Sequence, residues 1–171
     1  MTCRKELEAA MKETDRRWVG GPLSEPARQW VGSNLDWLAS ALAMFDRAGQ
    51  QVAMKGAELV ITHGEPHGAN LIRNGESRFL VDWDTVGLAL PERDLWMLDI
   101  AGADGFGAYV EAARRPVDHD AIEFYEIAWH MSDIALFVDL LRGRHADDAD
   151  TRSALANLAV AAARLAPYMP R

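Results

Sequence analysis

The dipeptide Asn74-Gly75, set between two short apolar runs, constrains the fold of this chain more than any other feature. Leu71-Ile72 precedes it and Phe79-Leu80-Val81 follows shortly after it. Asparagine and glycine both tolerate the positive φ of a tight turn, so the pattern predicts a β-hairpin. Such a hairpin would place the residues before its first strand beside those after its second.

Polar residues flank the expected hairpin on both sides, at the two positions that its strands would bring together. Glu65 and Asn70 lie just before the first expected strand, and Asp82 lies just after the second. Carboxylate and amide oxygens suit Mg²⁺, which usually takes only one or two protein carboxylates. We therefore expect Asn70 and Asp82 to hold a magnesium ion. Glu65 would then be free to orient, or accept the proton of, an attacking hydroxyl group. Asp82 ends an apolar run, where a charge is costly to bury unless it is paired.

Length, charge and cysteine content limit the class of protein. The 171 residues suit a single domain over 1–171. With 26 acidic against 18 basic side chains, the surface should repel nucleic acid and attract a cationic small molecule. The lone Cys3 excludes an internal disulfide, and neither a signal peptide nor a membrane span is visible. We expect a cytoplasmic protein without nucleic-acid or membrane partners.

The spacing of apolar residues predicts a mainly α protein with one small β-hairpin, which is an α+β fold. The expected core includes Trp83, Trp96 and Trp129. Asp118 is expected to cap the helix that ends near Leu141. The expected helices cover residues 1–19, 27–48, 92–101, 108–115, 119–141 and 151–165.

The polar residues of the hairpin region also match a known family pattern. Three segments carry this pattern: His63-Gly64-Glu65-Pro66-His67-x-x-Asn70, Val81-Asp82-Trp83-Asp84 and Pro91-Glu92-Arg93-Asp94-Leu95. In order and spacing they resemble the catalytic half of the aminoglycoside phosphotransferase family. That family shares the protein-kinase fold. The likeness covers residues from about 20 to 165 and implies the helical C-terminal lobe of that fold. By the likeness, residues 1–58 are N-terminal helices, 59–84 are the catalytic loop and hairpin, and 85–171 are a helical subdomain.

The resemblance also implies roles for individual residues. Glu65 falls on the catalytic carboxylate, where most of the family carries Asp. Asn70 and Asp82 fall on the residues that bind Mg²⁺ and, through it, ATP. Asp94 falls on an acid that braces the catalytic loop. The implied reaction moves the γ-phosphate of ATP to a hydroxyl of an aminoglycoside-like or other amine-rich small molecule.

Two departures from the family pattern bear on activity. Glu65 is one methylene longer than Asp, and small misplacements of a reacting group can cost on the order of 100-fold in rate. Residues 1–58 contain no G-x-G-x-x-G and no lysine in a strand context, so no N-terminal β lobe is expected. Activity of the chain alone should then be weak or absent. A piece of a longer protein, a naturally truncated gene, and a half that borrows its other lobe from a partner all fit this pattern.

Other interpretations stay open beside the kinase-like one. A non-catalytic binding module, for example a homodimer, would use the apolar surface that a missing lobe would leave uncovered. A metal-dependent hydrolase would use His63, His67 and Asp82. The H-E-x-x-H signature is not met because Glu65 is not adjacent to His63 and Pro66 interrupts any helix, so hydrogen-bonded support of the loop is the favoured role for His63 and His67. Asp84 fits a metal contact, a substrate contact or a surface acid equally well.

Overall fold

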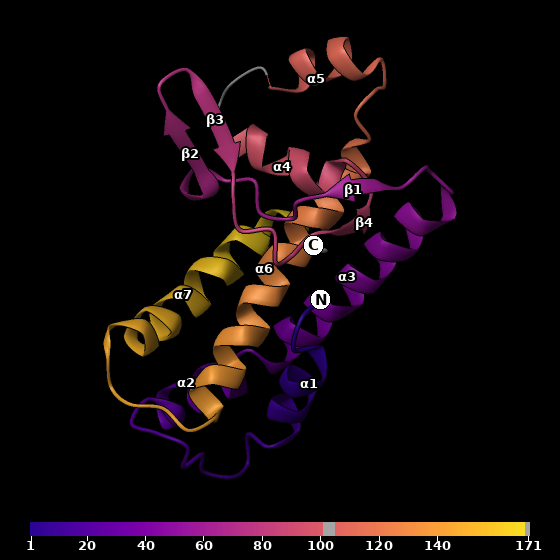
Figure 1. Ribbon diagram of the computed structural model, residues 1–171. Coiled ribbons are helices and arrows are strands. Elements are labelled where there is room, and N and C mark those ends of the chain that lie inside the picture. The colour runs from indigo at the N-terminus through magenta and orange to yellow at the C-terminus, as the bar shows by residue number, and fades with distance from the viewer. Residues whose placement is uncertain (101–104, 170–171) are drawn as a thin grey trace. The chain divides into compact units, whose positions relative to one another are not determined.

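The computed structural model describes residues 1–100 and 105–169. Helices make up most of this part of the chain, which also contains two small antiparallel sheets (Figure 1), and this confirms the predicted α+β class. Within the described residues, no helix is long and apolar enough to cross a membrane. The elements in chain order are α1 (Arg4–Lys12), α2 (Ser24–Ser33), α3 (Leu35–Met54), β1 (Val60–Thr62), η1 (Gly68–Asn70), β2 (Leu71–Asn74), β3 (Ser77–Leu80), β4 (Gly87–Ala89), α4 (Glu92–Ile100), α5 (Gly105–Ala113), α6 (His119–Arg142), α7 (Ala149–Leu165) and η2 (Ala166–Tyr168).

The chain divides into two compact units. The first comprises Met1–Ala48 with Ile127–Arg171, and the second comprises Gly49–Glu126. The first unit buries a helical core whose fully enclosed members include Val31, Leu38, Ile134, Leu141 and Leu158. All the predicted site residues belong to the second unit.

The helix predicted over 27–48 is two helices, α2 and α3, because Asn34 interrupts it. The Asn34 side-chain amide donates to the carbonyl of Trp30 at 2.7 Å, and its backbone N–H donates to Val31 O at 3.0 Å. Asparagine competes in this way for backbone partners, which ends the first helix. The apolar pattern continues across this break, since Val31 in α2 and Leu38 in α3 are both fully buried.

Other helix limits also differ from the predictions. The first helix covers only Arg4–Lys12, and the one predicted over 108–115 begins earlier, at Gly105. The last helix begins at Ala149 because Asp148 is its N-cap and Thr151 completes a capping box with it. Helix α4 is described to Ile100, so the predicted end at Ala101 lies outside the described residues.

The predicted hairpin is confirmed, with its turn one residue later than expected. Strands β2 and β3 pair from Leu71↔Leu80 to Asn74↔Ser77, so the two turn residues are Gly75 and Glu76. Gly75 has φ +60°, whereas Asn74 lies in the strand. A glycine with positive φ at the first central position is typical of a type II′ turn, whose twist matches that of the strands.

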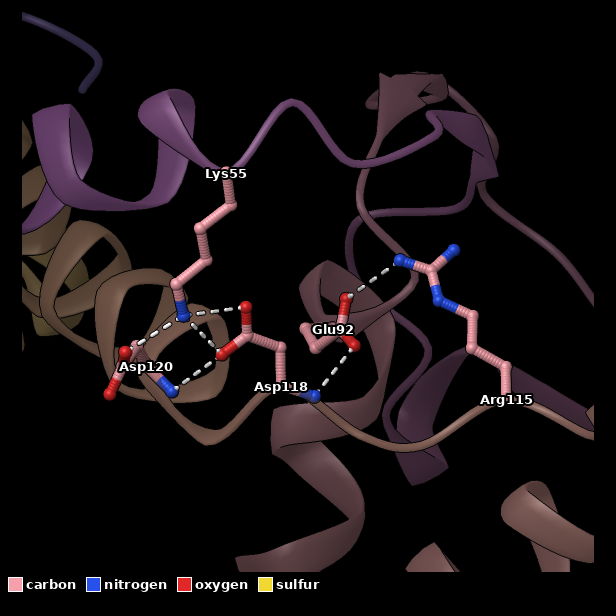
Figure 2. A network of polar contacts seen from close by, with 5 residues as sticks. All are labelled: Lys55, Glu92, Arg115, Asp118 and Asp120. Atoms are coloured by element: carbon pink, nitrogen blue, oxygen red, sulfur yellow. Dashed lines mark hydrogen bonds and ion pairs between the residues drawn. The ribbon is translucent and has the colours of Figure 1, made fainter.

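A charged network joins the start of α6 to the end of α3 and the start of α4 (Figure 2). The Lys55 ammonium donates to the carboxylates of Asp118 at 2.8 Å and Asp120 at 2.7 Å. Asp118 caps α6 as predicted, because its Oδ1 accepts from the Asp120 N–H at 3.1 Å. The Asp118 N–H donates to Oε1 of the fully buried Glu92 at 3.0 Å, and the Arg115 guanidinium lies 4.0 Å from Glu92 Oε2.

Candidate active site

Strand β1 leads into a loop that is held by the first turn of α4. The carboxylate of Asp94 accepts hydrogen bonds from the backbone N–H groups of His63 and Gly64, both at 2.7 Å. Hydrogen bonds to an ionised acceptor are about twice as strong as neutral ones. These contacts support the role of Asp94 as a brace for this loop.

The imidazole of His63 is fully engaged within the loop. It is 2% exposed, its Nε2–H donates to the carbonyl of Val81 at 2.9 Å, and its Nδ1 accepts from the Glu65 N–H at 3.2 Å. Those partners set the neutral tautomer, because a carbonyl can only accept and an amide N–H can only donate. The Trp83 ring packs edge-on against it, with ring centroids 4.7 Å apart. His63 therefore has no free nitrogen to offer a metal.

Asn70 lies at the open end of the hairpin, directly opposite Val81. The Val81 N–H donates to the Asn70 carbonyl at 2.9 Å, which extends the β2·β3 pairing by one position. Asn70 is thus paired with the residue that immediately precedes Asp82. The residue is 9% exposed, and its side-chain amide donates to Glu65 O at 2.9 Å, while its Oδ1 accepts no hydrogen bond from the described residues.

The backbone of Asp82 has a left-handed conformation, with φ +67°. The chain leaves β3 at Leu80, and the Asp82 side chain is exposed, so its charge is not buried at the end of the apolar run. Its carboxylate has no hydrogen bond or ion pair within the described part of the chain. A left-handed non-glycine residue costs about 1–3 kcal/mol and occurs preferentially at functional sites, although Asp tolerates it better than most.

Glu65 is half-buried, and its backbone is held from two sides by His63 and Asn70. Its carboxylate lies 3.9 Å from Nε2 of His67, which is itself 39% exposed. The site thus offers oxygen groups without hydrogen-bond donors from the described residues, on Glu65, Asn70 and Asp82. This donor set fits Mg²⁺, a hard cation that prefers carboxylate and amide oxygens.

The hydrolase interpretation gains no support from the geometry. Among residues 1–100 and 105–169, no three His, Cys, Asp or Glu side chains gather so as to hold a metal ion. Both nitrogens of His63 are already bonded within the loop.

Two neighbours of Asp82 complete the description of this edge. Trp83 is 49% exposed, so its assignment to the core is wrong: the indole packs on His63 at the surface and its Nε1–H donates to Leu80 O at 2.8 Å. Trp96 is 4% exposed, as expected of a core residue, and Trp129 is partly buried. Asp84 is exposed and keeps all three of its possible roles.

Three residues of this site were not identified from the sequence: Thr62, Thr85 and Arg93. The Thr85 hydroxyl donates to the carbonyl of His63 at 2.8 Å, and the Arg93 guanidinium contacts both Thr62 and Thr85. The only local signal was the position of Arg93 next to Asp94. Their partners are up to 31 positions distant, so no local pattern could have shown them.

Comparison with known proteins matches residues 4–130 to the model of the phosphotransferase enzyme family. Protein StrN of Streptomyces griseus is 32% identical over 96 residues, which are 56% of this chain and 27% of that protein.

Two solved structures of the spectinomycin phosphotransferase APH(9)-Ia share the fold. The complex with ADP and spectinomycin has a TM-score of 0.69 at 14% identity, covering 98% of this chain and 56% of that one. The AMP-bound complex has a TM-score of 0.61 at 15% identity, covering 93% and 52%. This chain therefore spans about a quarter to a half of the proteins it matches. The predicted kinase-like phosphotransferase fold is confirmed.

Proposed function

Because the chain belongs to the aminoglycoside phosphotransferase family, as its sequence pattern predicted, we propose that it takes part in moving the γ-phosphate of ATP to a hydroxyl of a small molecule. The observation that carries this proposal is the pairing of Asn70 with Val81 at the open end of the hairpin. Through this pairing, Asn70 lies opposite the residue that immediately precedes Asp82, whose backbone is left-handed and whose side chain is exposed.

Each site residue has a distinct part in this proposal. Asn70 and Asp82 would hold Mg²⁺, which neutralises phosphate charge when bound. Glu65 orients the acceptor hydroxyl and takes its proton. Asp94, through the N–H groups of His63 and Gly64, keeps the backbone that carries Glu65 in one position. His67, 3.9 Å from the Glu65 carboxylate, limits the freedom of that side chain.

The acceptor is proposed to be a cationic small molecule. The net charge of −8 favours the approach of amines and disfavours anionic acceptors. The structural neighbours are named for spectinomycin, so an aminocyclitol or aminoglycoside is a reasonable first acceptor to assay.

Turnover by this chain alone is expected to be slow. Residues 1–58 contain neither the glycine-rich loop nor the strand lysine that cover the nucleotide phosphates in kinases. The chain also spans only 56% of the spectinomycin phosphotransferase that it matches. Supplying the remaining lobe in trans should raise the rate.

Calorimetry with Mg-ADP tests the proposal without depending on turnover. We expect binding that requires Mg²⁺ and that weakens at least tenfold in Asp82→Asn, because a neutral amide is a poorer ligand for the cation. Glu76→Gln removes an exposed carboxylate from the hairpin turn and is the matched control. Absence of binding by the wild type, or equal binding by Asp82→Asn, would contradict the proposed roles.

One structural observation favours the second candidate, a binding module. Ile61 and Leu88 face each other across the β1·β4 pair and are 74% and 71% exposed. Large contiguous exposed apolar patches mark interaction surfaces, and this pair would form part of one. Light scattering that shows a stable dimer, together with no affinity for Mg-ADP, would favour the module over the enzyme.

A further inference from the structure

We propose that Arg93 is a positioning residue that sets the spacing between the two segments of the site, the one that carries Glu65 and the one that carries Asp82. The expected effect of Arg93 on Mg-ADP binding rests on the proposed function. The hydrogen bonds by which Arg93 bridges the two segments are contacts within the described residues.

The Arg93 guanidinium contacts both segments at once. Its Nη1 donates to Oγ1 of Thr62, at the end of the strand that leads to Glu65, at 2.8 Å. Its Nη2 donates to the carbonyl of Thr85, three residues after Asp82, also at 2.8 Å. A planar guanidinium presents its donors in a fixed fork, so one side chain holds two acceptors at a set separation.

The two acceptors are themselves held in place, which makes the bridge specific. Thr62 is 1% exposed, and its hydroxyl donates onward to the carbonyl of Gly87 at 3.0 Å. Thr85 also connects the second segment to the first, because its hydroxyl donates to the carbonyl of His63 at 2.8 Å. The segments before Glu65 and after Asp82 are thus connected by a closed set of hydrogen bonds with Arg93 among its members.

The residue that precedes Glu65 accommodates this bridge. A Cβ on Gly64 would clash with Nη2 of Arg93 and would lie 2.7 Å from Oγ1 of Thr85. The guanidinium therefore lies against the backbone of Gly64, in space that a side chain would fill. Gly64 also has φ +98°, a conformation that favours glycine.

Arg93 and Asp94, which are adjacent in α4, hold different parts of this site. Asp94 binds the N–H groups of His63 and Gly64 and so fixes only the first segment. Arg93 is bonded to the first segment and to the second. Loss of Arg93 should therefore loosen the spacing between the segments while the contacts of Asp94 remain.

Hydrogen exchange tests the bridge independently of any ligand. In Arg93→Ala we expect exchange at least tenfold faster in peptides covering 62–65 and 85–87, with helix α6 unchanged. Added guanidinium, far below denaturing concentrations, should slow that exchange again by occupying the vacated site. Arg93→Lys should recover only part of the protection because an ammonium lacks the planar fork. Arg78→Ala, which removes an exposed arginine of β3 without a partner in the described chain, is the control.

Mg-ADP affinity then separates positioning from simple stability. At a temperature where both proteins are folded, Arg93→Ala should bind Mg-ADP at least tenfold more weakly, with recovery by guanidinium. Unchanged exchange in both peptides, or affinity equal to wild type, would overturn the inference. A wild type that does not bind Mg-ADP would overturn the proposed function instead, and the exchange result would still decide the bridge.

Discussion

Asp94 accepts a 2.7 Å hydrogen bond from the backbone N–H of Gly64, which lies 30 positions earlier in the chain. The other oxygen of the same carboxylate accepts from His63 at the same distance. A single acid at the start of α4 thus holds two consecutive amides of the loop that carries Glu65.

Replacing Asp94 should destabilise the protein through the loop. Asp94→Ala removes the acceptor of two buried amides and should lower the free energy of unfolding by about 3 kcal/mol. Asp94→Asn keeps one acceptor oxygen and should lose roughly half of that. Urea denaturation gives both values. Asp84→Asn, at an exposed acid nearby, should change stability by no more than about 0.5 kcal/mol, and an equal loss there would argue against the brace.

Gly64→Ala should be costly for two separable reasons. The backbone at φ +98° is strained for alanine, by about 1–3 kcal/mol, and the new Cβ would meet Arg93 and Thr85. The double variant Gly64→Ala with Arg93→Ala should cost less than the sum of the single changes, because it relieves one of the clashes. Thermal or urea unfolding measures the cycle. Gly68→Ala is the control, since a Cβ at that position would have no neighbour within 4 Å and the φ of Gly68 is ordinary.

Two substitutions of Asp82 should differ in stability but not in their loss of Mg-ADP binding. Glycine relieves the left-handed strain at φ +67°, whereas alanine tolerates that conformation less well than aspartate does. Asp82→Gly should therefore be more stable than Asp82→Ala by about 1 kcal/mol. Both variants should lose affinity for Mg-ADP. If the two are equally stable in urea, the strain at this position is not significant in solution.

The Lys55 network should make stability depend on pH in a predictable window. Hydrogen bonding to Lys55 holds the pKa of Asp118 below its ordinary value of 3.8, so this contribution is present above pH 3.8 and is lost as pH falls through the lower folded pKa. Hydrogen bonds to Asp118 and Asp120 raise the pKa of Lys55 above 10.5, so its contribution is complete below that pH and is lost at higher pH.

Asp118→Asn isolates the charge in this network, because asparagine is also a good helix cap. The variant should unfold at lower urea than the wild type at pH 7, and the two should converge once pH falls below the folded pKa of Asp118. High salt at pH 7 should narrow the gap, since the Lys55 side chain is 39% exposed. A difference that persists at low pH would mean that the ion pair is not its cause.

Features that depend on neighbouring residues were readable from the sequence. The hairpin was predicted from Asn74-Gly75 between two apolar runs, and only its one-residue shift needed the structure. The helical class follows from apolar periodicity, and the family follows from the spacing of Glu65, Asn70 and Asp82. These signals are local, so tertiary packing changes their limits more than their existence.

Other features exist only because distant segments meet. Arg93 bonds to Thr62, 31 positions earlier, and to Thr85, 8 positions earlier. Asp94 bonds to Gly64, 30 positions earlier. Trp83 reads as a core residue by its size, yet it packs at the surface on His63. Asp82 follows the end of β3 and is exposed and left-handed there. By itself the sequence determined which groups could take part in the site, whereas tertiary structure decided how they are held, since long-range hydrogen bonds leave no periodic trace along a chain.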